Sequence, residues 1–308
     1  MPAIIVNKSQ FIEKPVDEVY ASVRDFKQWP AWSPWLIMER GCSLVYADDG
    51  KSYSWEGKVV GSGEMHIIAE SENHSINYDL RFLKPWKSQA DVQFSFAEKD
   101  GGTEVTWSMN SKMPIMMFWM TKMMTAFVGM DYERGLSMLK DHVETGSVPS
   151  KVDITGKTAF SGLSYVGVQR SCPIEEVGPS MQEDMTKLGE WGKEAAIVPA
   201  GLPFAIYKKW DMVNRQTTYI LGAQLASVPN DIPAGFVSGE IPPGDVFQIR
   251  HTGPYRHLGN AWSTGYAYSR AKVFKEDKKG PHFEIYEGDP METPENDLVT
   301  VLYFPVKG

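Results

Sequence analysis

The sequence contains very little cysteine, which excludes a disulfide framework. Only Cys42 and Cys172 occur among 308 residues, far apart and without neighbouring ligands at metal-binding spacing. Two isolated thiols are typical of a reduced intracellular protein. The first residues, MPAIIVNKSQ, have neither a basic flank nor a long apolar stretch, so we expect no signal peptide and a cytoplasmic location.

Histidine is also rare, and the common catalytic motifs are missing. The six histidines show neither H-x-x-H nor H-E-x-x-H spacing. There is no G-x-S-x-G elbow, and the Gly-Ser-Gly run at 61–63 lies between two predicted strands, whereas a phosphate-binding loop precedes a helix. We therefore expect no metal site and no cofactor.

Neither half of the chain has an excess of basic residues. The formal net charge is -8, with 16 basic against 20 acidic residues up to position 152 and 15 against 19 after it. Binding to nucleic acid needs clustered Lys and Arg, so we expect no nucleic-acid partner. The most apolar segment, residues 113–130, is interrupted by Pro114 and Lys122. We interpret it as a buried amphipathic helix, and expect no membrane partner.

The length favours two domains, because single cores seldom grow to 308 residues. A segment of small and turn-forming residues, ETGSVPSKVD, lies near the middle of the chain. We therefore expect domains at residues 1–148 and 153–308. The sequence leaves the oligomeric state open.

The first half predicts an α+β domain. A strand over residues 3–13 precedes a helix with Pro15 in its first turn. Alternating apolar residues then predict strands at 52–60, 63–70, 74–83, 88–97 and 103–110, and a long helix at about 115–145 closes the half. This order indicates a curved antiparallel sheet around the last helix.

Four segments of this half resemble the START-like superfamily with its helix-grip fold, near the polyketide cyclase/dehydrase group. They are IEKPVDEVYASVRDFKQWPAWSPW, WEGKVVGSGEMHI, DLRFLKPWKSQADVQFSF and TEVTWSM. The resemblance implies an apolar cavity between the sheet and the last helix. Methionines at 116, 117, 120, 123 and 124 would line that cavity, or else simply fill a core. We expect Trp29, Trp32 and Trp35 to pack the preceding loop onto the sheet.

The second half contains a repeat. The run FAIYK at 204–208 matches FEIYE at 283–287, an offset of 79 residues that also carries Tyr219 onto Leu298. Each run follows a strand and a helix that begins with proline, and precedes another strand. We therefore predict two copies of a strand–helix–strand–strand unit, joined in one sheet about a pseudo-twofold axis.

Glu284 breaks this repeat, because Ala205 stands at the corresponding place in the first copy. The alternation of side chains along a strand puts Glu284 on the same face as Tyr286, with Tyr207 on the matching face of the other copy. A carboxylate surrounded by tyrosines suits a cationic ligand, through charge and through cation–π contact.

Three segments of this half resemble the GyrI-like effector-binding domains: IRHTGPYRHLGNAW, FEIYEGDP and NDLVTVLYFPV. The resemblance covers about residues 153–308. It implies that Glu284 meets the positive charge of a lipophilic ligand. The cleft aromatics it implies are Tyr255, Trp262, Tyr207, Trp210 and Tyr219. Tyr286, on the Glu284 face by alternation, is the sixth aromatic residue that we expect in the site. Related regulators carry a helix-turn-helix segment before this domain, and no such segment is recognisable here.

Three functions remain open at this point. The first is binding of small apolar molecules with a cationic or electrophilic group, for sensing, sequestration or carriage. The second is a hydrolase that opens strained or electrophilic molecules with Glu284 as its catalytic residue, since some family members resemble such enzymes. The third is a gyrase-inhibitor-like protein interaction, which the diffuse acidic charge disfavours. We expect a binding protein.

Overall fold

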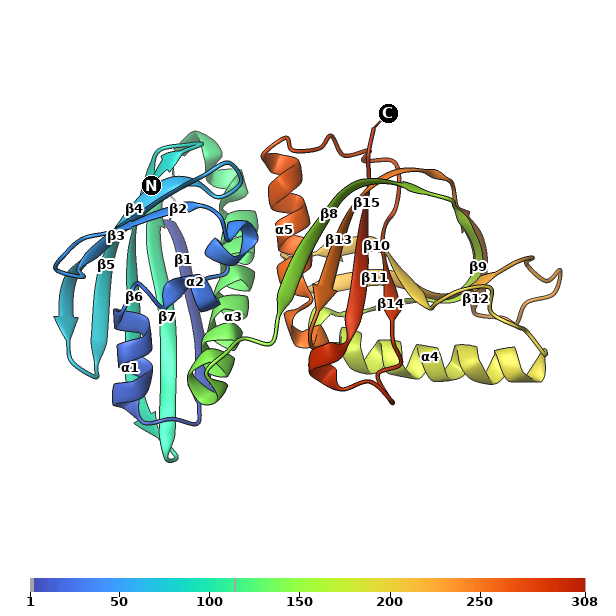
Figure 1. Cartoon of the computed structure of the whole chain (residues 1–308), viewed down its shortest axis with the longest axis horizontal. Coiled ribbons are helices and arrows are strands. Elements are labelled where there is room, and N and C mark those ends of the chain that lie inside the picture. Colours follow the sequence, from blue (N-terminus) through green and yellow to red (C-terminus); the bar gives the residue numbers. More distant parts are fainter. Residues whose placement is uncertain (1–2, 114, 308) are drawn as a thin grey trace. The chain divides into compact units, whose positions relative to one another are not determined.

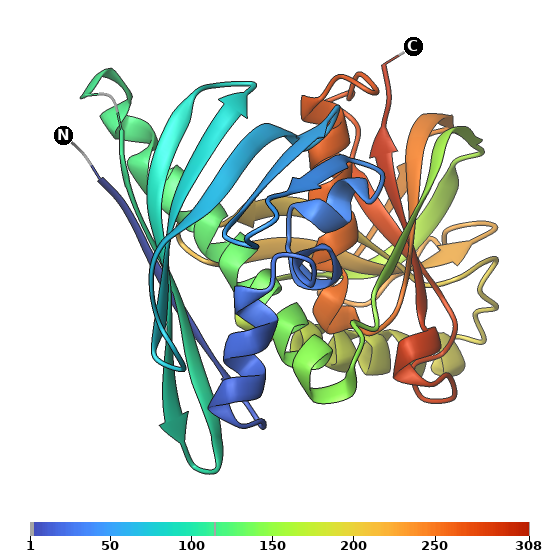
Figure 2. The same ribbon diagram turned by 60° about the vertical axis from the view of Figure 1, so that its left-hand side comes forward.

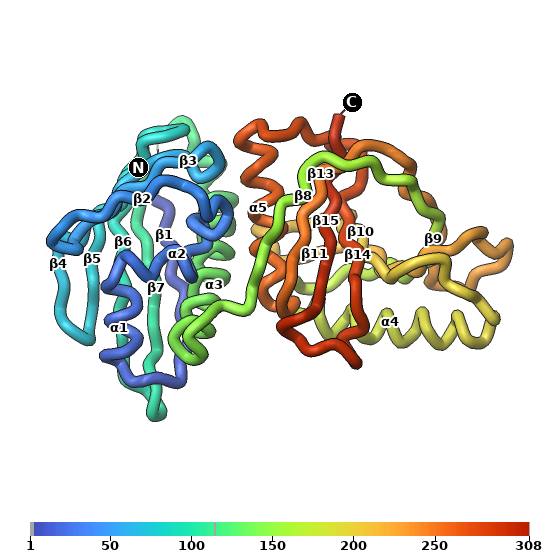
Figure 3. Tube along the Cα trace, in the orientation of Figure 1, coloured from blue at the N-terminus to red at the C-terminus, as the bar shows by residue number. Residues whose placement is uncertain are grey.

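The computed structural model describes residues 3–113 and 115–307 (Figure 1). The chain divides into two compact units, Met1–Pro149 and Ser150–Gly308. Each unit has its own antiparallel sheet and its own helices. The chain trace passes from one to the other through the short segment between α3 and β8 (Figure 3).

The first unit is a seven-stranded sheet with one long helix. Its sheet order is β1-β7-β6-β5-β4-β3-β2, with every pairing antiparallel. The elements are β1 (Ala3–Ile12), α1 (Val16–Arg24), α2 (Trp29–Trp32), η1 (Leu36–Glu39), β2 (Ser43–Tyr46), β3 (Ser52–Gly57), β4 (Gly61–Ser71), β5 (Ser75–Lys84), β6 (Ser88–Lys99), β7 (Gly102–Lys112), η2 (Ile115–Met120) and α3 (Thr121–Thr145).

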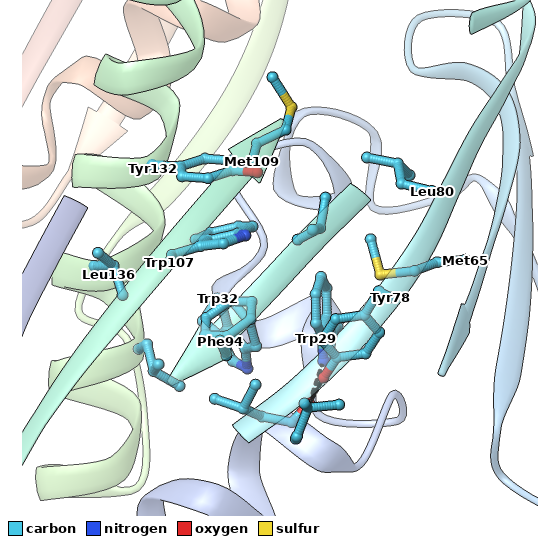
Figure 4. Packing of buried hydrophobic residues seen from close by; sticks show 14 of the residues in the cluster. Trp29, Trp32, Met65, Tyr78, Leu80, Phe94, Trp107, Met109, Tyr132 and Leu136 are labelled. Carbon is cyan, nitrogen blue, oxygen red and sulfur yellow. Dashed lines mark hydrogen bonds between the residues drawn. The ribbon is translucent and has the colours of Figure 1, made fainter. Parts of the chain in front are cut away.

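Aromatic side chains fill the space between this sheet and α3 (Figure 4). The ring of Trp107 on β7 stacks on Tyr132 of α3, with centroids 3.9 Å apart. Trp29 and Trp32 are fully buried beside them. Gly135 makes this close packing possible, because a Cβ there would lie 2.7 Å from the Trp107 ring. The core is therefore built from large rings.

The expected role of the methionine cluster is wrong for most of its members. Met116, Met117 and Met123 are exposed, so they line no enclosed cavity and fill no core. Met120 and Met124 are half-buried and pack against the core. No residue of η2 is buried, and Met123 lies on the exposed side of the first turn of α3. Among the described residues, no helix is long and apolar enough to cross a membrane.

The second unit is an eight-stranded sheet with two main helices. Its sheet order is β12-β9-β11-β10-β14-β15-β13-β8. The elements are β8 (Lys151–Phe160), β9 (Leu163–Pro173), η3 (Ile174–Glu176), α4 (Val177–Glu194), β10 (Phe204–Asp211), β11 (Gln216–Leu225), β12 (Phe236–Ile241), β13 (Gly244–Thr252), η4 (Tyr255–His257), α5 (Gly259–Arg270), β14 (His282–Glu287), η5 (Glu295–Asp297) and β15 (Val299–Pro305).

The predicted duplication is confirmed by the strand order. Strands β9, β11 and β10 on one side of the sheet correspond to β13, β15 and β14 on the other, and the central pair is β10–β14. One detail of the repeat was wrong. Tyr207 pairs with Tyr219, and its counterpart Tyr286 pairs with Thr300, so the structural counterpart of Tyr219 is Thr300 and not Leu298. The two copies differ in length between these strands, which a single offset misses.

Both faces of this sheet are covered. The face that carries Ala205, Tyr207 and Glu284 packs against α4 and α5, while the opposite face carries a separate apolar cluster that includes Phe204, Phe283 and Ile285. Gly265 lets α5 approach the sheet, since a Cβ there would lie 2.1 Å from the ring of Phe304 on β15. Since each unit combines an antiparallel sheet with helices, the α+β class predicted for the chain is confirmed.

Candidate ligand-binding site

Glu284 lies at the centre of the second sheet and is almost completely buried. It is in the middle of β14, between Ala205 of β10 and Leu302 of β15, with only 1% of its surface exposed. Its neighbours Phe283, Ile285 and Tyr286 are also buried, because both faces of the central strands are covered. A carboxylate is rarely found in such a place without a compensating partner.

Three aromatic side chains donate hydrogen bonds to this carboxylate. The hydroxyls of Tyr207 and Tyr286 donate to Oε1 over 3.0 and 2.6 Å, and the indole Nε1 of Trp262 donates to Oε2 over 2.8 Å. The donors come from β10, from β14 itself and from α5. The two tyrosines occupy the same position of the two repeats, so both copies contribute to one acceptor.

The compensation is by dipoles and not by a charge. Among the described residues, Glu284 has no ion pair with Lys, Arg or His. Burial raises the pKa of Glu284, and the hydrogen bonds from Tyr286, Trp262 and Tyr207 act in the opposite direction without cancelling it. Burial and the nearby carboxylate together hold the pKa of both tyrosines well above 10, so the hydroxyls remain donors. When Glu284 is ionised, its charge is therefore balanced by hydrogen-bond donors alone among the described residues.

Further aromatic rings surround these donors. The Trp262 ring is perpendicular to Tyr207 at 5.5 Å, and Trp210 meets the same tyrosine edge-on at 5.4 Å. Tyr255 meets Tyr286 at 5.8 Å in the same manner. Trp210 and Tyr255 are each 39% exposed, so they form the part of the cluster that solvent reaches. We call Glu284, Tyr207, Tyr286, Trp262, Trp210 and Tyr255 the aromatic cage.

Tyr219 is the one predicted site residue that serves a different group. It lies opposite Tyr207 on the neighbouring strand, but its hydroxyl donates to Asp184 of α4 over 2.8 Å. Arg170 of β9 also donates to this fully buried carboxylate. The interaction fixes α4 on the sheet.

The sequence carried a signal for this group. Ser180, Asp184 and Leu188 are spaced four residues apart, and all three face the sheet from α4. A carboxylate on the buried stripe of an amphipathic helix indicates a partner on the sheet. The partner itself, Arg170, had no distinguishing pattern.

A further buried polar group lies on the other side of the repeat axis. His251 of β13 is fully buried, and its Nε2 lies 3.1 Å from the hydroxyl of Ser150, to which Asn260 of α5 also donates. Burial, with a smaller contribution from nearby His257, lowers the pKa of His251 to about 4. It is therefore neutral near pH 7 and acts as part of the packing.

The described residues contain no group of three or more His, Cys, Asp or Glu side chains that could hold a metal ion. The two cysteines are free thiols in different units. Chemically, the aromatic cage offers one carboxylate whose two oxygens already accept hydrogen bonds. Such a group is suited to binding a cation more than to attacking a substrate.

Comparisons with known proteins agree with this division of the chain. Residues 3–144 match the family model described as polyketide cyclase/dehydrase and lipid transport, and residues 160–307 match the GyrI-like small molecule binding domain. No curated protein gives a significant match to the chain.

Several solved structures are similar to parts of the chain. A chain of the cryo-EM structure of the EcmrR–DNA complex is 13% identical, with 60% of this chain and 65% of that one covered, slightly less than two thirds, and a TM-score of 0.43. SAV2435 bound to tetraphenylphosphonium is 16% identical, with coverages of 51% and 94% and a TM-score of 0.38. CV1439 from Chromobacterium violaceum is 16% identical, with coverages of 47% and 99% and a TM-score of 0.36.

The family models and the folds of the two units lead to the same assignment, and support small-molecule binding in general terms. The chain joins a START-like domain of the polyketide cyclase/dehydrase and lipid transport family to a GyrI-like small molecule binding domain.

Proposed function

We propose that the second unit binds small, largely apolar molecules that carry a positive charge, with Glu284 as their counter-ion. The observation that carries this proposal is a buried carboxylate held by three neutral donors, with no ion pair among the described residues. Removing a charge from water is unfavourable unless it is paired. A ligand cation would supply the missing pair.

The rings around Glu284 fit the rest of such a ligand. Tyrosine and tryptophan faces attract cations through their quadrupoles and bury apolar surface at the same time. The exposed edges of Trp210 and Tyr255 are the first contacts that an incoming ligand can make. Because Glu284 is buried beneath the rings that donate to it, the ligand must then displace Trp262 or Tyr207 from the carboxylate. We expect binding to reorient at least one of these rings.

A hydrolase that uses Glu284 is the second candidate. The raised pKa of this carboxyl is a property that general acids and bases share. Against it, both oxygens already accept hydrogen bonds, and the side chain is almost completely buried.

We also propose a cytoplasmic location, with which the two free thiols, Cys42 and the buried Cys172, agree.

The test measures the affinity of the full chain for an aromatic cation by calorimetry, at a pH where Glu284 is ionised. Tetraphenylphosphonium supplies the cation, and triphenylphosphine oxide is the neutral comparison. Glu284→Gln keeps the shape and deletes the charge, so cation affinity falls by about 2–3 kcal/mol, or about 30- to 150-fold. Affinity for the neutral compound changes much less.

Glu287→Gln is the matched control. Glu287 ends the same strand, but it is half-exposed and paired with Arg250, so its loss leaves cation affinity unchanged. The proposal is contradicted if the two variants lose the same cation affinity, or if Glu284→Gln loses none. The hydrolase is favoured if electrophilic esters or epoxides are consumed by the wild-type chain and not by Glu284→Gln.

A further inference from the structure

Large apolar side chains are exposed together at one end of the first unit. The exposed fractions range from 40% for Met117 to 89% for Met116. Two of the side chains belong to the β5–β6 hairpin and five to η2. We call them the apolar tip: Leu83, Trp86, Ile115, Met116, Met117, Phe118 and Trp119.

The strand register brings the two parts of the apolar tip to the same end of the sheet. Phe82 pairs with Ser88 where β5 turns into β6, and Ala90 of β6 pairs with Ser111 at the end of β7. The chain leaves β7 at Lys112 and enters η2 at Ile115. Figure 2 shows the hairpin and the start of the long helix together at the top of this unit.

An exposed group of this kind is unusual in water. Isolated apolar side chains are common on protein surfaces, but several exposed Trp, Phe, Ile, Leu and Met side chains gathered at one end of a sheet indicate an interaction site. The core of the unit does not need these side chains, since rings such as Trp107 and Tyr132 already fill it. The apolar tip is therefore available to an external partner.

Unpaired lysines lie around the apolar tip. Lys87, Lys112 and Lys122 are exposed, and none of the described carboxylates forms an ion pair with them. Lys84 is paired with Glu56. Residues 80–90 and 110–130 contain no Asp or Glu, in a chain whose net charge is -8. Apolar side chains next to unpaired lysines complement an anionic lipid surface.

We propose that the apolar tip docks the first unit onto anionic membrane surfaces, with its rings in the interfacial layer and its lysines at the lipid headgroups. Trp and Phe suit this layer, and lysine side chains extend to it readily. A surface contact needs no spanning helix, so the failure of residues 113–130 to qualify as a span does not argue against it. A second copy of the chain is a poorer partner, because two tips would bring six lysines together. This proposal is independent of the ligand of Glu284.

The experiment measures sedimentation of the full chain with lipid vesicles. One set contains equal parts of phosphatidylglycerol and phosphatidylcholine, and the other contains phosphatidylcholine alone. The chain sediments with the anionic vesicles, less at high salt, and far less with the neutral ones. Lys87→Gln, Lys112→Gln and Lys122→Gln together lower the affinity by roughly 100-fold, about fivefold for each lysine. Phe118→Ser with Trp119→Ser lowers it at least about tenfold.

Matched variants keep the result specific to the apolar tip. Val45→Ser with Ile68→Ser removes two apolar side chains of the same unit that are each 62% exposed. Lys27→Gln, Lys51→Gln and Lys99→Gln remove three exposed lysines that lie away from the apolar tip in that unit. Both sets retain vesicle binding, and circular dichroism shows that every variant is folded. The proposal is overturned if the wild-type chain does not sediment with anionic vesicles, or if the tip variants and the control variants bind these vesicles equally. It is also overturned if light scattering shows that tip substitutions abolish only self-association.

Discussion

Ala205 and Glu284 face each other across the central strand pair of the second unit, at the point where its pseudo-twofold axis crosses the sheet. The neighbouring pairs, Phe204 with Ile285 and Ile206 with Phe283, are exchanged by that axis, while this pair maps onto itself. Directly opposed residues lie only about 5 Å apart between their Cβ atoms. The axis therefore has room for one carboxylate, which explains why the repeats differ here.

The first prediction places a second carboxylate on the axis. Ala205→Glu introduces a like charge next to the buried Glu284, and the pair cannot both ionise without a large penalty. Ala205→Gln is the control, since it adds a neutral side chain of the same size. At pH 7 we expect the Glu variant to be less stable than the Gln variant by about 3 kcal/mol, measured by urea unfolding. Equal stability at pH 7 would show that the axis is solvated.

The second prediction concerns the charge of Glu284 in the unliganded protein. Because the folded pKa is above the ordinary value of 4.5, the folded state binds this proton more tightly than the unfolded state. The stability that Glu284 contributes is complete below pH 4.5 and is lost as pH rises through the folded pKa. The Glu284→Gln protein has no such loss of stability. Its stability relative to the wild type therefore increases as pH rises, and at pH 7 it is at least as stable as the wild type. A Glu284→Gln protein whose stability relative to the wild type decreases with rising pH would contradict this assignment.

The third prediction concerns His251, which titrates in the opposite sense. Its folded pKa is lowered to about 4, so the unfolded state takes up the proton first as pH falls. The chain therefore loses about 2–3 kcal/mol of stability from this residue between pH 6.5 and pH 4. His251→Asn removes that part of the acid sensitivity, as seen in unfolding curves at several pH values. The exposed His74, changed to Asn, is the control for removing a histidine.

The fourth prediction concerns the boundary between the units. We expect residues 1–148 and 153–308 to fold when expressed separately, because each has its own sheet and core. A fragment that starts at residue 150 is more stable than one that starts at 153, by about 1–2 kcal/mol. The reason is that Ser150 hydrogen-bonds to His251 and Asn260, and β8 begins at Lys151. Chemical unfolding of the two fragments measures the difference, and an aggregated first fragment would show that the units depend on each other.

The sequence predicted the elements whose local pattern repeats. The alternation along residues 204–207 and 283–286 placed Tyr207 and Tyr286 on the Glu284 face. In the structure the hydroxyls of both tyrosines donate hydrogen bonds to the Glu284 carboxylate. Period-2 alternation determines a face regardless of the rest of the fold. The same reasoning could not say that the hydroxyl of Tyr219 turns to Asp184, because that depends on the position of α4.

The side of a segment that the rest of the unit covers was not predictable. The methionines of residues 116–124 have a helical spacing that fits a buried face, yet Met116 and Met123 are exposed, and no residue of η2 is buried. Likewise, the burial of Glu284 follows from two helices packing on a sheet with strands on both sides. No window of sequence around residue 284 contains that information.

The central claim is that the ionised carboxylate of Glu284 is the counter-ion of a bound cation. The most direct measurement is the affinity of the full chain for tetraphenylphosphonium, which has no titratable group, as a function of pH. In the wild-type chain the affinity rises with pH through the raised pKa of Glu284 and then levels off, because only the ionised carboxylate pairs with the cation. In Glu284→Gln the affinity is low and independent of pH over the same range. Identical pH profiles in the two proteins, or equal affinity at high pH, would contradict the account.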